Sequence, residues 1–293
     1  MQTTSPPRKQ TGLTRRSRAA LVAAGFAVAA TAVTVPLVTP LSDGKAPHVG
    51  LVIPEGWRAG QVYAAVDKAL RLPPGSTRKS LSKAHLKLPR DARGNPEGYL
   101  FPASYPLPER ATPQSVLRHM VETANKRFGG GTITAGAQRH ALTGYQAVTI
   151  ASIVQAEAAT KADMAKVARV VFNRLERGMP LQMDSTLNYA LKRSTLKTTV
   201  RDTKINSPYN SYRSMGLPPT PISNPGEDAM RATLNPAPGN WLYFVTVKPG
   251  DTRFTASYEE QQRNVAEFNR LRAARQRPRG PYDAGAGGGS GQR

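Results

Sequence analysis

The chain has 293 residues, and its 41 Lys and Arg against 19 Asp and Glu give a net charge of +22. The 39% of hydrophobic residues exclude a disordered protein, and the absence of cysteine excludes disulfides, thiolate metal sites and a cysteine nucleophile. The charge suits a nucleic-acid binder, but it suits equally a protein held against an anionic membrane or cell-wall polymer. The histidines are scattered, with no pair at helical spacing, so we expect neither a zinc site nor a cofactor.

The N-terminal sequence predicts export. Residues 19–41 carry no charge and are long enough to cross a membrane, and the basic tail 1–18 precedes them. This charge bias predicts a single-pass cell-membrane protein whose N-terminus is cytoplasmic and whose body is extracytoplasmic. The alternative is a cleavable signal peptide, since Ala30-Thr31-Ala32 has the small-x-small form of a cleavage site. Both interpretations export the body and weigh against nucleic acid as a partner.

After a spacer at 42–48, the segment 49–96 predicts a small α/β module. Residues 49–53 favour an extended strand, and a short helix is expected over 76–86. Between them lies a helical pattern with one apolar face, formed by Val62, Val66, Ala69 and Leu70. A module of this size does not bury enough surface to be stable alone, so we expect it to pack on the more C-terminal part of the chain.

A third helix is expected from Thr112-Pro113 to about Phe128, where the glycines 129–131 end it. In the helical pattern of 145–158, Glu157 ends an apolar stripe shared with Ile150, Ile153 and Val154. Burial would raise the pKa of such a carboxyl group and make it a general acid. The alternative is a frayed helix end at which Glu157 reaches water.

Thr160 and Asp163 predict a capping box for the next helix, which ends at Gly178, so that Glu157 lies at the bend of a helical hairpin. Beyond it, three proline-stiffened loops carry Tyr, Asn, Gln and Asp side chains suited to sugars: 179–186, 207–212 and 216–225. For Asp184 an N-cap role is as good an interpretation as a functional one. For Asn224 the N-cap role, with Pro225 and Glu227 after it, is the better one.

The C-terminal part predicts a scaffold. A buried strand is expected over 241–247, with a turn and a hairpin partner over 253–256. Ser257 and Glu260 open a last amphipathic helix that reaches about Arg277. The basic, Gly-rich tail 269–293 has little to bury and is expected to be disordered.

Seven motifs in this order resemble the YceG-like (MltG) family of membrane-anchored endolytic murein transglycosylases over residues 49–268. They are Glu97-Gly-Tyr-Leu-Phe-Pro102, Ala151-Ser-Ile-Val-Gln-Ala-Glu157, Val171-Phe-Asn-Arg-Leu175, Gly178-Met-Pro-Leu-Gln-Met-Asp184, Ser207-Pro-Tyr-Asn-Ser-Tyr212, Gly216-Leu-Pro-Pro219 with Ile222-Ser-Asn-Pro225, and Leu242-Tyr-Phe-Val245. The resemblance implies an α+β protein with an N-terminal transmembrane helix, a LysM-like module at 49–96 and a mixed helical and β catalytic domain at 97–268. It implies a lyase that cuts the β-1,4 bond between N-acetylmuramic acid (MurNAc) and N-acetylglucosamine (GlcNAc) within nascent glycan strands and leaves 1,6-anhydro ends.

The resemblance also implies the site residues and partners. Glu157 stands at the second acidic position of the family's Glu-x-Glu motif and would act as general acid and then base, because Gln155 at the first position cannot. The glycan cleft would be lined by Asn173, Gln182, Asp184, Tyr209, Asn210 and Tyr212. Partners would be peptidoglycan glycan strands, the membrane, and cell-wall synthases or the division and elongation machinery.

The sequence departs from the family pattern in three places. Besides Gln155, Ser185 stands where the family often has Pro, and one LysM-like segment is missing. These departures motivate the alternative of a catalytically inactive glycan-binding scaffold of the wall-synthesis machinery.

Overall fold

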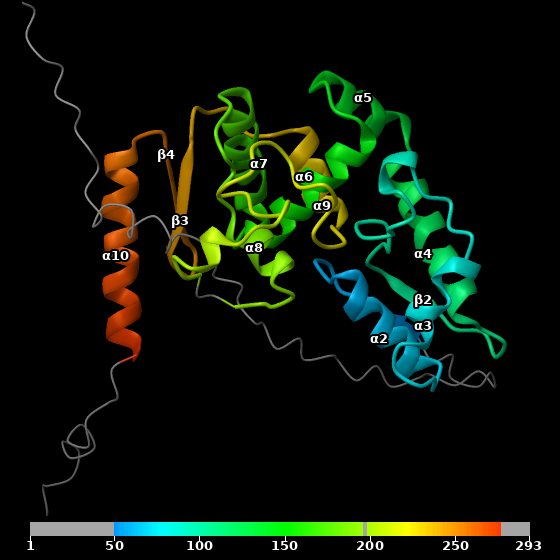
Figure 1. Ribbon diagram of the computed structural model, residues 1–293. Coiled ribbons are helices and arrows are strands. Elements are labelled where there is room, and N and C mark those ends of the chain that lie inside the picture. The colour runs from blue at the N-terminus through cyan, green and yellow to red at the C-terminus, as the bar shows by residue number, and fades with distance from the viewer. Residues whose placement is uncertain (1–49, 196–197, 277–293) are drawn as a thin grey trace, which may run out of the picture.

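A computed structural model describes residues 50–195 and 198–276 of the chain (Figure 1). The predicted membrane segment 19–41, the spacer 42–48 and residues 277–293 lie outside the described residues. Within the described ranges, no helix is long and apolar enough to cross a bilayer. The fold is mixed α+β, and two short antiparallel sheets accompany the helices in this part of the chain.

The N-terminal strand pairs across a long sequence separation. Strand β1 (Gly50–Val52) lies antiparallel to β2 (Ser104–Pro106), with Leu51 opposite Tyr105. This pairing crosses the expected boundary between 96 and 97. Leu51 and Val62 belong to the same buried cluster as Ile150 and Ile153, so the N-terminal segment shares its core with the rest of the described chain.

Helix α2 (Ala59–Ala69) buries Val62 and Val66, as the apolar pattern predicted. The single helix expected over 76–86 is wrong: the structure has a short α3 (Ser76–Lys79) and a 3-10 turn η2 (Leu81–Lys83). The Ser80 hydroxyl donates to the Thr77 carbonyl, a local bond that competes with helix continuation. A further 3-10 turn, η3 (Arg90–Ala92), lies between η2 and the first family motif, which begins at Glu97.

Helix α4 (Pro113–Phe128) begins at the predicted cap, where the Thr112 hydroxyl accepts from the Ser115 N–H. Gly129 ends it, but α5 (Gly131–Arg139) begins almost at once and was not predicted. The predicted hairpin consists of α6 (Gly144–Glu157) and α7 (Lys161–Glu176). Thr160 caps α7 by accepting from the Asp163 N–H, and its hydroxyl donates to the Asp163 carboxylate.

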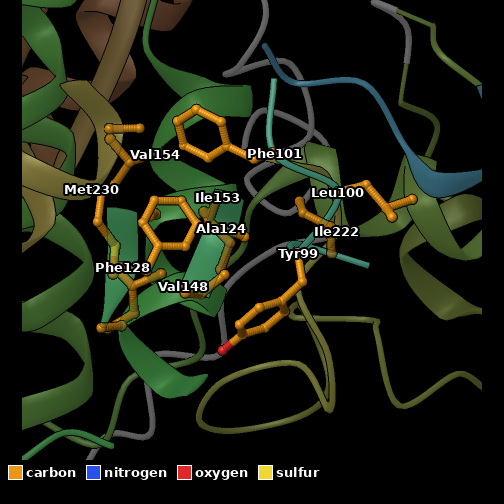
Figure 2. Packing of buried hydrophobic residues seen from close by; sticks show 14 of the residues in the cluster. Tyr99, Leu100, Phe101, Ala124, Phe128, Val148, Ile153, Val154, Ile222 and Met230 are labelled. Atoms are coloured by element: carbon orange, nitrogen blue, oxygen red, sulfur yellow. The ribbon is translucent and has the colours of Figure 1, made fainter. Parts of the chain in front are cut away.

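The core is built around α6, which packs on α7 and on α9 (Glu227–Leu234) near the centre of the molecule (Figure 1). Figure 2 shows Val154 of α6 beside Phe101, Phe128 and Met230, which come from three other segments. The rings of Phe101 and Phe128 meet edge to face at 5.5 Å between centroids. This packing fixes α6, and with it the position of Glu157.

On the other side of α7, strands β3 (Tyr243–Lys248) and β4 (Asp251–Thr255) form the predicted hairpin, and α10 (Tyr258–Gln276) packs on it (Figure 1). Helix α10 occupies residues 269–276, so the disorder expected from 269 onward is wrong for those residues. The short helix α8 (Asp184–Ala190) and the 3-10 turn η4 (Asp202–Lys204) complete the described elements.

Candidate active site

Glu157 is the last residue of α6 and is buried, with 7% of its surface exposed. Its Oε1 accepts a hydrogen bond of 3.1 Å from the main-chain N–H of Ser185, the second residue of α8. The frayed-end alternative is therefore wrong. The apolar stripe of α6 leads the carboxyl group into the interior, where α8 meets it.

Burial controls the protonation of Glu157. Desolvation, with a smaller contribution from the negative charge of Asp184, raises the pKa of its carboxyl group from 4.5 to about 7. Hydrogen bonding from Ser185 stabilises the carboxylate and opposes the shift without cancelling it. At neutral pH Glu157 is thus divided between acid and base forms, which suits a group that must first give and then accept a proton.

Asp184 lies beside Glu157 and does not cap α8. The N-cap residue is Met183, and Asp184 stands in the first turn with 2% of its surface exposed. Its Oδ1 accepts a 2.6 Å hydrogen bond from the Tyr212 hydroxyl. Burial raises the pKa of Asp184 to about 6, so most of it is ionised at neutral pH.

Three of the expected cleft residues, Asn173, Gln182 and Asn210, bond to other parts of the protein instead of facing an open cleft. Asn173 donates through Nδ2 to the carbonyls of Gly239 and Trp241, at 3.2 and 2.8 Å. The Oε1 of Gln182 accepts from Arg174, a buried guanidinium that also donates to nearby carbonyls.

The Asn210 side chain is fully buried and organises the loop that carries Tyr212. Its Nδ2 donates to the carbonyls of Thr203 and Ile205, and its Oδ1 accepts from the Tyr212 N–H. Tyr209, by contrast, is half-buried, and its hydroxyl bonds with the Thr220 hydroxyl at 2.9 Å. The structure therefore brings together Glu157, Asp184 and Tyr212, while Asn210 supports them from behind.

Comparison with known proteins assigns the chain to a family. The sequence profile of the YceG-like family matches residues 8–267. The chain belongs to the YceG-like family.

Curated relatives in this comparison bear the name endolytic murein transglycosylase. One, from Bacillus subtilis (strain 168), is 35% identical over 173 residues, which are 59% of this chain and 48% of the relative. Another, from Streptococcus pneumoniae serotype 2 (strain D39), is 37% identical over 182 residues, which are 60% of this chain and 33% of the relative. The matched part thus spans half or less of the length of these relatives.

A solved structure supports the same assignment. The crystal structure of a YceG-like protein from Listeria monocytogenes matches with a TM-score of 0.66 at 28% sequence identity, over 73% of this chain and 74% of that one. The α+β arrangement of short sheets and helices is therefore that of a YceG-like protein.

Gln155 of this YceG-like chain has a structural partner. Its Oε1 accepts a 3.0 Å hydrogen bond from the Gly226 N–H, at the start of α9. Its side chain thus ties α6 to α9, whereas that of Glu157 meets α8. The two positions of the acidic motif serve different contacts.

The predicted N-cap role of Asn224 is wrong. The N-cap of α9 is Gly226, with no side-chain bond to the helix. Asn224 is fully buried, accepts from the Leu100 N–H at 2.8 Å and donates to the Trp57 carbonyl at 2.8 Å. It bridges Trp57, just before α2, and Leu100 of the first family motif. Both partners are too distant in sequence for a local capping pattern to indicate them.

A further buried carboxyl group, Glu97, was not predicted from the sequence as a functional candidate. It has 4% of its surface exposed and accepts from the Ala59 N–H at 2.8 Å and from the Tyr189 hydroxyl at 3.1 Å. Burial raises its pKa to about 7, against the opposing effects of these donors and of Arg58. The sequence signal that could have identified Glu97 was its position beside Gly98, at the start of the first family motif.

Proposed function

We propose that the chain is an endolytic peptidoglycan lytic transglycosylase that cleaves the MurNAc-β-1,4-GlcNAc bond within nascent glycan strands and leaves 1,6-anhydroMurNAc ends. The observation that carries this proposal is the buried carboxyl group of Glu157, whose pKa is raised to about 7. Family membership and the relatives named endolytic murein transglycosylase support it.

One carboxyl group serves both halves of this reaction. Protonated Glu157 gives its proton to the glycosidic oxygen as the bond from that oxygen to C1 breaks, so GlcNAc leaves with a free 4-hydroxyl. The carboxylate then accepts the proton of the C6 hydroxyl of MurNAc as O6 bonds to C1. Water is not consumed, and Glu157 returns to its acid form.

Asp184 has an electrostatic role in this proposal. Glycoside cleavage passes through a transition state with positive charge on the sugar ring, and a nearby carboxylate stabilises it. Asp184 is buried, is held by the short bond from Tyr212, and raises the pKa of Glu157. We assign Asp184 to charge stabilisation, with Tyr212 orienting it and half-buried Tyr209 available to a sugar face.

The placement of the enzyme is part of the proposal. Residues 19–41 anchor it, the tail 1–18 stays in the cytoplasm, and the segments 49–96 and 97–268 lie outside against the wall. The apolar run, the basic residues before it and the family profile that begins at residue 8 support this placement. The net charge of +22 favours contact with anionic wall polymers, and wall synthases would be the protein partners.

Product analysis tests the reaction. The chain from residue 45 to 277 is incubated with uncross-linked glycan strands beside a Glu157→Gln control, and the soluble products are measured by mass spectrometry. We expect internal fragments that end in 1,6-anhydroMurNAc and are absent from the control. Reducing ends would show hydrolysis with Asp184 activating water. No product from folded protein that still binds glycan would support the inactive scaffold.

A further inference from the structure

The start of α2 is linked to α8 directly by Arg58 and indirectly by Ala59, through Glu97. The Ala59 N–H donates to Glu97 Oε1 at 2.8 Å, and Glu97 Oε2 accepts from the Tyr189 hydroxyl of α8 at 3.1 Å. The Arg58 guanidinium donates to the carbonyls of Asn188 and Arg193, at 3.2 and 3.0 Å, and lies 5.3 Å from the centre of the Tyr189 ring. We call Arg58, Glu97 and Tyr189 the clamp.

The clamp contacts α8, the helix that also contacts the carboxyl group of Glu157. Helix α8 has only seven residues, and Tyr189 stands four residues after Ser185, about one turn along the helix. Ser185 donates its N–H to Glu157, and Asp184 lies beside it. A short helix moves as a unit, so whatever fixes Tyr189 also fixes the donor to Glu157.

The clamp is buried enough to hold its geometry. Glu97 is 4% exposed, and Arg58 and Tyr189 are half-buried. Asn224 adds a long contact of 3.5 Å to Glu97 Oε1 while it also holds the Trp57 carbonyl. A charged hydrogen bond away from solvent is worth more than a surface one, which gives the clamp the strength to position a helix.

We propose that Glu97 is a positioning residue of the active site: through Tyr189 it sets the place of α8 and hence the Ser185 hydrogen bond to Glu157. The N-terminal segment that carries Arg58 and Ala59 is then a structural part of the active site and not only a spacer or an accessory module. The inference rests on the proposed function only in its activity readout.

The test measures the pKa of Glu157 directly, by carboxyl ¹³C NMR titration of the chain from residue 45 to 277. The Glu157 resonance is assigned as the one that is missing from the spectrum of Glu157→Gln. Glu97→Ala and Tyr189→Phe each remove the hydrogen bond between Glu97 and α8. Because the Ser185 bond stabilises the carboxylate, its loss raises the pKa of Glu157, and we expect a rise of about half a pH unit or more. On glycan strands we expect kcat to fall about 10-fold with KM changed less than about 3-fold.

A conservative variant and a packing control separate positioning from general damage. Glu97→Gln keeps an acceptor for Ala59 and presents an amide donor to the Tyr189 oxygen, so kcat and the Glu157 pKa should stay within about 2-fold and about 0.2 pH units of the parent. Val66→Ala removes buried volume from α2 without touching the clamp, so it should lower the unfolding free energy and leave the Glu157 pKa unchanged.

An unchanged Glu157 pKa in both Glu97→Ala and Tyr189→Phe would overturn the inference, as would an equal shift in Val66→Ala. Tyr189→Phe loses only one hydroxyl, so it remains informative if Glu97→Ala does not fold. If the parent protein cleaves no glycan, the proposed function fails, while the titration still decides whether the clamp positions α8.

Discussion

The main-chain N–H of Ser185 donates to Glu157 Oε1 over 3.1 Å and thereby joins the end of α6 to the start of α8. One main-chain donor satisfies part of a buried carboxylate and leaves the rest of its desolvation cost uncompensated. The pKa of about 7 results from this imbalance between desolvation and hydrogen bonding. The same imbalance that makes Glu157 a usable acid makes it a cost to folding at neutral pH.

Glu157→Gln should therefore stabilise the protein in a pH-dependent way. The folded-state pKa of about 7 lies above the ordinary 4.5, so the folded state binds this proton more tightly. Below about pH 4.5 both states are protonated and the variant gains nothing. As pH rises from 4.5 to 7 the parent loses stability, up to about 3 kcal/mol at about 1.4 kcal/mol per pH unit, and the variant does not.

Urea unfolding of both proteins at pH 4.5 and pH 8 measures this difference. The matched control is Glu122→Gln, which removes an exposed carboxyl group from α4. A Glu157→Gln variant that is no more stable than its parent at pH 8 would show that the carboxyl group is well solvated and would remove the basis for its role as acid.

Tyr212→Phe tests the charge on Asp184. We expect cleavage by the parent to rise as Asp184 ionises near pH 6 and to fall as Glu157 loses its proton near pH 7. The Tyr212 bond lowers the pKa of Asp184, so its loss moves the acidic limb of the profile to higher pH. A charged hydrogen bond worth about 1.5–3 kcal/mol predicts a fall in kcat of about 10-fold or more at pH 6.

The measurement is the pH dependence of kcat for the parent, Tyr212→Phe and Tyr258→Phe, the last being a tyrosine at the start of α10 against the Tyr243 ring. The basic limb should move to slightly lower pH, because a less ionised Asp184 raises the pKa of Glu157 less. Identical acidic limbs in all three proteins would exclude an ionised Asp184 from the reaction.

The parts of the site that sequence predicted were those with a local pattern. The 3.6-residue period of α6 placed Glu157 on the buried face, and the caps of α4 and α7 were identified from single hydroxyl residues. Asp184 and Asn224 also stand where caps are common, but each is used by a distant partner, Tyr212 and Leu100 respectively. Local propensity cannot report such tertiary contacts.

The sequence could not predict the pairing of β1 with β2 or the contact of Glu97 with Tyr189, for the same reason. Both join segments separated by roughly fifty to ninety residues, and neither has a period or a spacing. Helix α5 was missed because Gly129 and Gly130 indicated a loop, while tertiary packing of Ala137 allows a helix to start directly after them.

Gln155→Glu should not increase activity. A glutamate at this position can accept the Gly226 N–H as Gln155 does, and in the proposed mechanism the acid is Glu157. Because Glu55 lies against Gly226, the added charge should lower the unfolding free energy by no more than about 1 kcal/mol. We expect kcat within about 2-fold of the parent.

Gln155→Leu is the matched variant, since it removes the acceptor and leaves the Gly226 N–H unpaired, at a cost of about 1–3 kcal/mol of stability. Product release from glycan strands and urea unfolding measure the two effects. A gain of more than about 10-fold in kcat for Gln155→Glu would mean that the first acidic position carries the chemistry and that the natural chain lacks its acid.

Asn210→Ala should unfold more easily because the side chain holds three main-chain groups, the carbonyls of Thr203 and Ile205 and the N–H of Tyr212. Leaving these groups unpaired in a fully buried place costs about 2–3 kcal/mol. Tyr212 loses its fixed position with them, so kcat should fall while glycan affinity changes little. The exposed Asn206 in the same loop provides the control, Asn206→Ala, with unchanged stability. If Asn210→Ala instead keeps the parent's unfolding free energy but loses affinity for glycan strands, its amide binds sugar directly and the hydrogen bonds to the loop are secondary.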